Sequence, residues 1–152
     1  TRVMLFDPND SSNNTVYAGG VSGGLLVNTN ITNSSSQWSR VTGVPGNLSV
    51  SSITVDPNNS NVWYVGTGEQ YTAGDVVGTG VYKTTNGGTT WSAVNIPAAG
   101  AATFPFNSTN LFLSGIFYVN DVIAWNNGGN TELFVAVGAF VYGDASSPAN
   151  WG

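Results

Sequence analysis

The chain has 152 residues, a net charge of −5 and only 7% charged residues. Its cations are Arg2, Arg40 and Lys83, which form no basic cluster, so the composition argues against nucleic-acid binding. Cysteine and histidine are absent, which excludes disulfides and thiolate ligands and removes the commonest general base. No run of about 18 apolar residues occurs. We therefore expect no membrane-spanning helix, no metal site and no cofactor.

The first apolar run, Val3-Met4-Leu5-Phe6, predicts a β-strand. Neither a methionine nor a signal peptide precedes it, so we expect a segment of a longer precursor. The polar residues are mainly Asn, Ser and Thr, which favour turns and strands over helices. This composition, with lysine almost absent, also favours an extracellular setting over a cytoplasmic one.

The segment that follows this run begins a repeat. Asp7-Pro8-Asn9 recurs 49 residues later as Asp56-Pro57-Asn58. An aromatic-rich run follows each copy, at 15–19 and at 62–66, and a weaker third copy lies at 122–127 and 132–138. Repeats of this period are typical of tandem β-sheet architectures.

Each repeat is predicted to form four short strands, because apolar and polar residues alternate between turns rich in Gly, Pro and Asn. In the second repeat these strands are 51–55, 62–66, 80–84 and 90–95. Trp38, Trp91 and Trp151 close the three repeats. No stretch keeps a helical apolar period for three turns.

Tandem four-stranded repeats predict an all-β fold, namely a β-propeller of four-stranded antiparallel blades. We expect about three blades, at 1–42, 50–96 and 118–152, the last one incomplete, with an inserted loop at 97–117. A closed ring needs roughly four or more blades. The chain is therefore predicted to be a fragment of a larger closed propeller, because three blades alone would leave two sheet flanks exposed to solvent. A single β-sandwich is the alternative.

A hairpin motif in the second repeat resembles the Asp-box of BNR-repeat propellers. Its pattern, Thr-x-Asn-x-Gly-x-Thr-Trp, is formed by Thr84, Asn86, Gly88, Thr90 and Trp91. In such a turn the Asn accepts hydrogen bonds from nearby amides, Gly supplies positive φ and Trp packs between strands. The resemblance implies a structural hairpin between the third and fourth strands, away from the catalytic face. A metal site there would need more carboxylates.

The wider pattern of residues 56–91 looks like the propellers of large secreted surface proteins from Bacteroidetes-type bacteria. Sortilin-type and xyloglucanase-type propellers are more distantly similar. The resemblance implies a secreted or cell-surface location on the exterior of the bacterial outer membrane. The partners it implies are the remaining blades of the same protein and, on export, components of the type IX secretion system.

Two enzyme classes with Asp-box propellers can be tested on the residues. Sialidases bind a carboxylate with three arginines, but this chain offers only Arg2 and Arg40. Xyloglucanase-type enzymes need two facing carboxylates, and the stretch matching their first catalytic Asp, 18–25, has no acid. No catalytic residue is therefore assigned in this chain.

The two longest predicted loops, 67–79 and 97–117, share one face of a propeller by topology. We hypothesise that they form a rim facing a ligand or partner, built from Glu69, Tyr71, Asp75, Phe104, Phe106 and Phe112. The alternative is that these phenylalanines pack the loops onto the blades and that the acids are solvated or cap turns.

Together these features predict a non-catalytic binding or scaffold module at the cell surface, recognising an extracellular glycan or another surface protein. Two alternatives stay open. The chain could be part of a glycoside hydrolase whose catalytic acids lie in other blades, or a secretion-cargo segment bound by export machinery.

Overall fold

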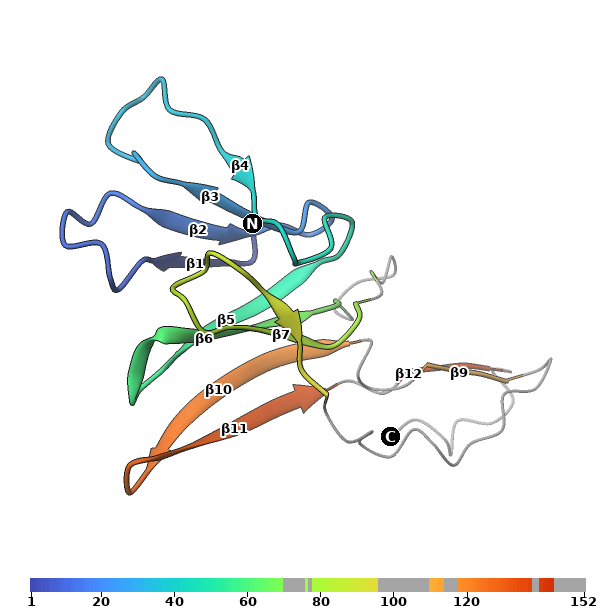
Figure 1. Cartoon of the computed structure of the whole chain (residues 1–152). Coiled ribbons are helices and arrows are strands. Elements are labelled where there is room, and N and C mark those ends of the chain that lie inside the picture. The colour runs from blue at the N-terminus through green and yellow to red at the C-terminus, as the bar shows by residue number, and fades with distance from the viewer. Residues whose placement is uncertain (70–75, 77, 96–109, 114–117, 138–139, 144–152) are drawn as a thin grey trace.

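The computed structural model describes residues 1–69, 76, 78–95, 110–113, 118–137 and 140–143. This part of the chain is all-β, with antiparallel strand pairs and no helix (Figure 1). Accordingly, no helix in the described ranges has the length and apolarity needed to cross a membrane. The all-β prediction is confirmed for these residues.

The first sheet contains β1 (Val3–Phe6), β2 (Val16–Gly19), β3 (Leu25–Asn28) and β4 (Ser39–Arg40), side by side in chain order. Asp10 shapes the turn between β1 and β2, because its carboxylate accepts hydrogen bonds from Ser12 and from the Asn14 and Thr15 amides. These bonds, led by the one from the Ser12 hydroxyl, hold the pKa of Asp10 well below its ordinary value.

The second sheet repeats this order with β5 (Val50–Asp56), β6 (Asn59–Thr67), β7 (Val81–Thr84) and β8 (Ser92–Ala93). These strands lie where the sequence predicts them, within a few residues at each end. The turn of Asp-Pro-Asn works in the same way in both sheets. Asp7 and Asp56 each accept a hydrogen bond from the amide two residues ahead, at 2.8 Å.

The third sheet contains β10 (Val119–Asn127) and β11 (Asn130–Val137). Later in the third repeat, β12 (Phe140–Gly143) pairs with β9 (Asn110–Leu113) and not with β11. The apolar run at 111–113 gives β12 a pairing partner within the expected inserted loop. Among the described residues, the third repeat therefore differs from the expected four-stranded unit.

The three sheets stack face to face in chain order (Figure 1). We call the face of each sheet that is turned toward the following sheet its forward face, and the opposite face its rear face. For the third sheet, the forward face is the one turned away from the second sheet. For the first sheet, the rear face is the one turned away from the second sheet.

Two apolar cores hold the stack together. The first joins the forward face of the first sheet to the rear face of the second, and its buried members include Tyr17, Leu25, Trp63 and Val65. The second core joins the forward face of the second sheet to the third sheet, through residues such as Tyr64 and Val122. Full burial of one such side chain stabilises a fold by about 1.5–3 kcal/mol, so these cores dominate the packing between sheets.

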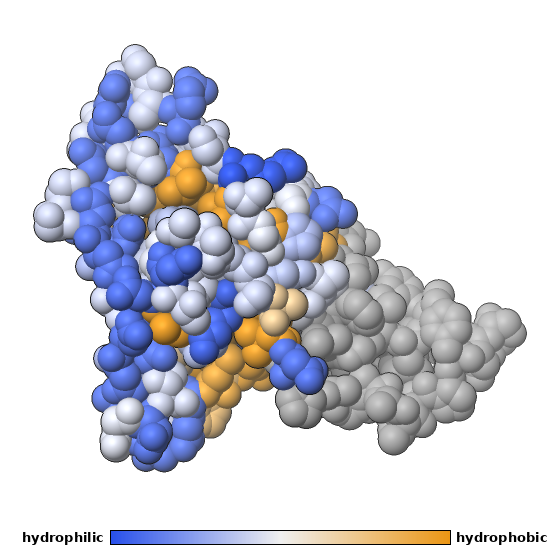
Figure 2. Space-filling model, in the orientation of Figure 1, coloured by the Kyte–Doolittle hydropathy of each residue, from blue (hydrophilic) through white to orange (hydrophobic). Residues whose placement is uncertain are grey.

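Hydrophilic turns line one edge of the stack. The β1–β2, β5–β6 and β10–β11 turns lie together at the left of Figure 1, and Figure 2 shows this edge as mainly hydrophilic. The β4–β5 connection leaves from the opposite end of these strands (Figure 1). This arrangement separates short polar turns from the end where the rim residues are expected.

Candidate functional site

The structure describes only part of the predicted rim. Tyr71, Asp75, Phe104 and Phe106 lie outside the described residues. Phe112 lies in β9, where its backbone pairs with Val141 of β12. Glu69 follows β6 and is fully described. It forms an isolated backbone bridge with Val76, with N–H···O distances of 2.8 and 3.1 Å.

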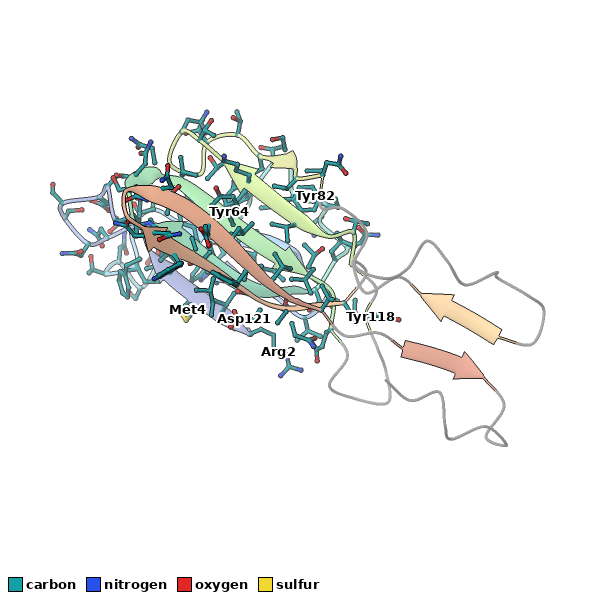
Figure 3. All side chains as sticks on the ribbon, turned by 90° about the horizontal axis from the view of Figure 1, so that it is seen from below. Arg2, Met4, Tyr64, Tyr82, Tyr118 and Asp121 are labelled. Carbon is teal, nitrogen blue, oxygen red and sulfur yellow. The ribbon has the colours of Figure 1, made fainter. Side chains whose placement is uncertain are left out.

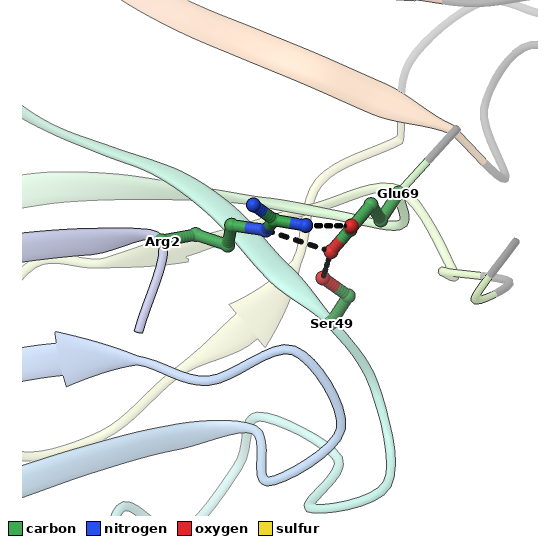
Figure 4. A network of polar contacts seen from close by, with 3 residues as sticks. All are labelled: Arg2, Ser49 and Glu69. Carbon is green, nitrogen blue, oxygen red and sulfur yellow. Dashed lines mark hydrogen bonds and ion pairs between the residues drawn. The ribbon is translucent and has the colours of Figure 1, made fainter. Parts of the chain in front are cut away.

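The side chain of Glu69 is expected from the sequence to face a ligand, but the structure buries it against Arg2 and Ser49 (Figure 4). The Arg2 guanidinium donates from Nε to Oε2 at 3.0 Å and from Nη2 to Oε1. Ser49 Oγ donates to Oε2 at 3.3 Å. The Glu69 side chain is 2% exposed and the Arg2 side chain 39%.

The electrostatics of this group follow from its contacts. The Arg2 hydrogen bonds lower the pKa of Glu69 below its ordinary value of 4.5, while partial removal from water works in the opposite direction. The ionised carboxylate therefore joins three segments: the start of the first sheet, the start of the second sheet, and the segment after β6. In the described part of the chain, Glu69 acts as a structural tie.

A second polar contact joins β5 to β10. Ser52 Oγ lies 2.8 Å from the Asp121 carboxylate and accepts a hydrogen bond from the Val122 amide at 3.0 Å. Ser51 Oγ donates to the Val119 carbonyl. Asp121 is therefore held in place by the neighbouring sheet.

The described carboxylates serve mainly in turns and in contacts between sheets. Asp7, Asp10, Glu69 and Asp121 have been described above. Asp56 accepts a hydrogen bond from the Thr131 hydroxyl at 2.6 Å. Glu132 accepts one from Asn127, also at 2.6 Å. Within the described ranges, no group of three or more acids is placed to hold a metal ion.

The hairpin of residues 84–91 has the bonds of a closed turn. Asn86 Oδ1 accepts from the Thr90 amide and from the Thr84 hydroxyl, both at 2.9 Å, and Asn86 Nδ2 donates to Thr90 Oγ1 at 2.9 Å. The Gly88 amide donates to Thr84 Oγ1 at 3.0 Å. Gly87 and Gly88 have φ values of 64° and 85°, which glycine adopts without strain.

This hairpin also contacts the first sheet. Trp91 Nε1 donates to the Gly88 carbonyl at 2.9 Å, and the Trp91 ring packs edge-on against Trp63. Trp63 in turn packs against Tyr17 with ring centroids 5.0 Å apart. The residues of the hairpin motif thus fix a turn and anchor it in the core between the two sheets.

An apolar surface that the sequence reasoning did not single out covers the forward face of the third sheet. Ile123, Trp125 and Phe134 are exposed there, and the rings of Trp125 and Phe134 lie 6.2 Å apart. A hollow of about 260 Å³ lies beside them, lined by Asp121, Ile123, Phe134, Val135 and Ala136. Figure 3 views the β10–β11 strand pair from below, with Asp121 labelled.

A signal for this surface is present in the sequence. Successive residues of a strand point to opposite faces of its sheet, and in β10 and β11 the residues on both faces are often apolar, as in Leu133-Phe134-Val135. Such a pattern predicts a strand that is covered on both faces. The third repeat also carries Trp125 where the first two repeats have Asp7 and Asp56.

The rear face of the first sheet is the second exposed apolar surface. Met4 and Phe6 alternate with the core-facing Val3 and Leu5, and their side chains are more than half exposed. Trp38, which precedes β4, is exposed as well. Both ends of the stack thus present apolar side chains.

Comparisons of the chain with protein-family models, with curated proteins and with solved structures give no match.

Proposed function

We propose that the three sheets are consecutive blades of an Asp-box β-propeller. In this proposal the chain serves as a non-catalytic binding or scaffold module of a secreted bacterial surface protein, exported by a type IX system, that recognises a glycan or another protein. One observation carries the proposal. Successive sheets pack forward face to rear face twice, through cores of the same kind. Face-to-face stacking of four-stranded antiparallel sheets in chain order is how propellers are built.

The acids support a binding role over a catalytic one. Glycosidic bond cleavage needs two carboxylates facing each other across a cleft. Each described Asp and Glu instead accepts a hydrogen bond from a protein group, in a turn or in a contact between strands or sheets. Such acids position backbone and side chains, and a fold of this kind leaves ligand recognition to its longer loops.

A binding and hydrolysis assay on the purified chain tests the proposal. We expect retention on one or more immobilised bacterial or host polysaccharides or surface proteins, without release of reducing sugar. The variant Tyr71→Ala tests the predicted rim and should weaken this binding by about tenfold or more. Thr85→Ala, in the exposed hairpin, is the matched control and should bind normally.

Either of two results would contradict the proposal. Release of reducing sugar by the purified chain would make it a glycoside hydrolase. Failure to bind any member of the panel would remove the recognition role.

A further inference from the structure

We propose that Asn127, at the tip of the β10–β11 hairpin, is a site of spontaneous deamidation. Asn86, in the hairpin of residues 84–91, is protected from the same reaction by its packing. These two asparagines form the two Asn-Gly pairs of the sequence, and a second glycine follows each pair. The two sites are therefore alike in local sequence and differ in structure. The inference is independent of the proposed function, because it concerns the chemistry of the turns alone.

The reaction is an attack of the main chain on its own side chain. The backbone nitrogen of the residue after the asparagine forms a bond to the side-chain Cγ, and the bond from Cγ to Nδ2 breaks. Ammonia leaves with the amide proton, and a succinimide ring remains. Water then adds to one of the two ring carbonyls and opens the ring, which gives an aspartyl or an isoaspartyl residue. A glycine after the asparagine favours the attack, because it has no Cβ to crowd the nitrogen.

The tip of the β10–β11 hairpin leaves the reacting groups accessible. Apart from adjacent residues, no atom lies within 4 Å of a Cβ added to Gly128 or Gly129. Among the described residues, no hydrogen bond occupies the Gly128 amide. The Asn127 side chain makes one hydrogen bond there, from Nδ2 to Glu132 Oε1 at 2.6 Å, and both residues are exposed. Local opening of such an exposed tip requires little free energy.

Exposure is a property of this whole turn edge and does not depend on what lies against the forward face of the third sheet. The equivalent β5–β6 turn belongs to the second sheet, which the third sheet covers, and residues 57–61 are still exposed. Contact with the next sheet is made there by side chains, such as Asn58 Nδ2 to Thr131 Oγ1 at 2.8 Å. An adjoining sheet thus leaves the residues of such a turn open to water.

Asn86 has the same two glycines after it, but its reacting groups are held. Its Oδ1 accepts hydrogen bonds from the Thr90 amide and the Thr84 hydroxyl, and its Nδ2 donates to Thr90 Oγ1, all at 2.9 Å. The attacking nitrogen is occupied as well, because the Gly87 amide donates to the Asn61 carbonyl at 2.9 Å. Attack at this site therefore requires these bonds to break first.

The core beneath the 84–91 hairpin adds to the protection. Gly88 is buried, and a Cβ added to it would lie 2.6 Å from Tyr17 Oη. Its carbonyl accepts a hydrogen bond from Trp91 Nε1 at 2.9 Å. Turning the side chain of Asn86 toward the main chain therefore requires local opening of core contacts, and the free energy of that opening slows the reaction.

Deamidation of Asn127 should loosen the tip of its hairpin. The new carboxylate cannot donate to Glu132, so two negative charges face each other at that contact. The isoaspartyl product also adds a methylene group to the main chain, inside the short turn that pairs Asn127 with Asn130. Amide hydrogen exchange at residues 126–131 in fresh and in aged protein measures the loosening. Identical exchange in both samples would contradict this consequence.

Peptide mapping of the purified chain during prolonged incubation at neutral pH tests the proposal. Cleavage after aromatic residues places Asn86 in peptide 83–91 and Asn127 in peptide 126–134. Mass spectrometry follows the exchange of an amide for a carboxyl group, and synthetic standards identify the aspartyl and isoaspartyl forms. We expect Asn127 to be converted at least about tenfold faster than Asn86. Equal rates, or faster conversion of Asn86, would overturn the proposal.

The same incubation in guanidinium chloride separates structure from local sequence. Both sites read Asn-Gly-Gly, so we expect them to react at similar rates in the unfolded chain, with Asn86 strongly accelerated. A difference that persists after unfolding would assign it to local sequence and contradict protection by packing. An Asn127 that reacts in the unfolded chain but stays unchanged in the folded chain would contradict the proposal as well.

Three substitutions locate the reaction. Asn127→Gln should leave peptide 126–134 unconverted, because the longer side chain must close a larger ring and reacts more slowly. Asn130→Gln changes the other asparagine of the same tip, which no glycine follows, and should react like the wild type. Thr90→Val removes the hydroxyl that holds Asn86 Nδ2 and should accelerate conversion of Asn86. Conversion of peptide 126–134 that continues in Asn127→Gln would overturn the assignment.

Discussion

At the scale of single residues, the contact between Arg2 and Glu69 shows how a buried carboxylate is paired with a cation within the stack. The two residues are 67 positions apart in the chain, and their ion pair is partly buried. The sequence predicts that 67–79 is a loop, but it gives no signal that Arg2 lies beside it. Pairing between distant residues is set by the packing of sheets, so local patterns do not predict it.

Removing Arg2 is expected to destabilise the chain. Arg2→Ala leaves the Glu69 carboxylate with Ser49 as a hydrogen-bond partner, and we expect a loss of about 1–2 kcal/mol in the free energy of unfolding, limited by the exposure of Arg2. Urea denaturation at pH 7 measures it. Glu132→Gln, at an exposed acid, is the control and should change stability by less than about 0.5 kcal/mol.

The same contact predicts a pH dependence with a definite sign. The folded-state pKa of Glu69 lies below 4.5, so its contribution is complete above pH 4.5 and is lost as the pH falls through the lowered pKa. The stability difference between wild type and Glu69→Gln should therefore shrink on acidification below pH 4.5. A difference that stays constant down to pH 2 would contradict the prediction.

Asn86 allows a sharper test, because two substitutions separate the stability contribution of its side-chain oxygen from that of its side-chain nitrogen. Asn86→Asp keeps an acceptor for the Thr84 hydroxyl and the Thr90 amide, and we expect stability close to that of the wild type. Asn86→Ala loses the acceptor and should cost about 1–2 kcal/mol. Thermal unfolding measures both, with Thr85→Ala as the control. Equal losses for Asp and Ala would show that the acceptor is not what matters.

At the scale of elements, the 84–91 hairpin is fixed by its contact with the first sheet as well as by its own bonds. A Cβ added to Gly88 would lie 2.6 Å from Tyr17 Oη and 2.8 Å from Trp63 Cζ3. The hairpin of one sheet is thus seated on aromatic side chains from two sheets. The motif pattern predicts the turn, but not the partners, since these come from separate repeats.

Gly88→Ala is expected to be strongly destabilising, by about 2–4 kcal/mol, because it combines a positive φ of 85° with these short contacts. Gly128→Ala is a matched comparison. Gly128 has a φ of 60° with no atom near an added Cβ, so only the backbone term of about 1 kcal/mol applies. Chemical denaturation of both variants measures the difference, and equal losses would contradict the role of the contact.

Strand positions in the first two sheets could be predicted, whereas the pairing of β12 could not. Alternation and turn residues mark where a strand begins and ends. They do not say which neighbour it selects, and the apolar run in β9 offers β12 an alternative to β11. The β12–β9 pairing is a contact between segments far apart in the chain, which alternation within a strand does not encode.

At the scale of the whole molecule, the sequence predicts tandem sheets and raw flanks, but not which residues form those flanks. Phe134 and Tyr64 look alike in the repeat, and so do Trp38 and Trp91. Their exposure differs because a neighbouring sheet covers one of each pair. Position within the stack, which no local pattern encodes, decides whether the same side chain is core or surface.

The strict chain order of strands within each of the first two sheets has a consequence for how the polypeptide acquires its structure. Every hydrogen-bonded neighbour in those sheets is also the next strand along the chain. Pairing between neighbouring strands of one segment costs less loop-closure entropy than pairing between segments far apart in the chain. Each of these two sheets can therefore form from its own segment of the chain, and its apolar face then offers the surface against which the next sheet packs.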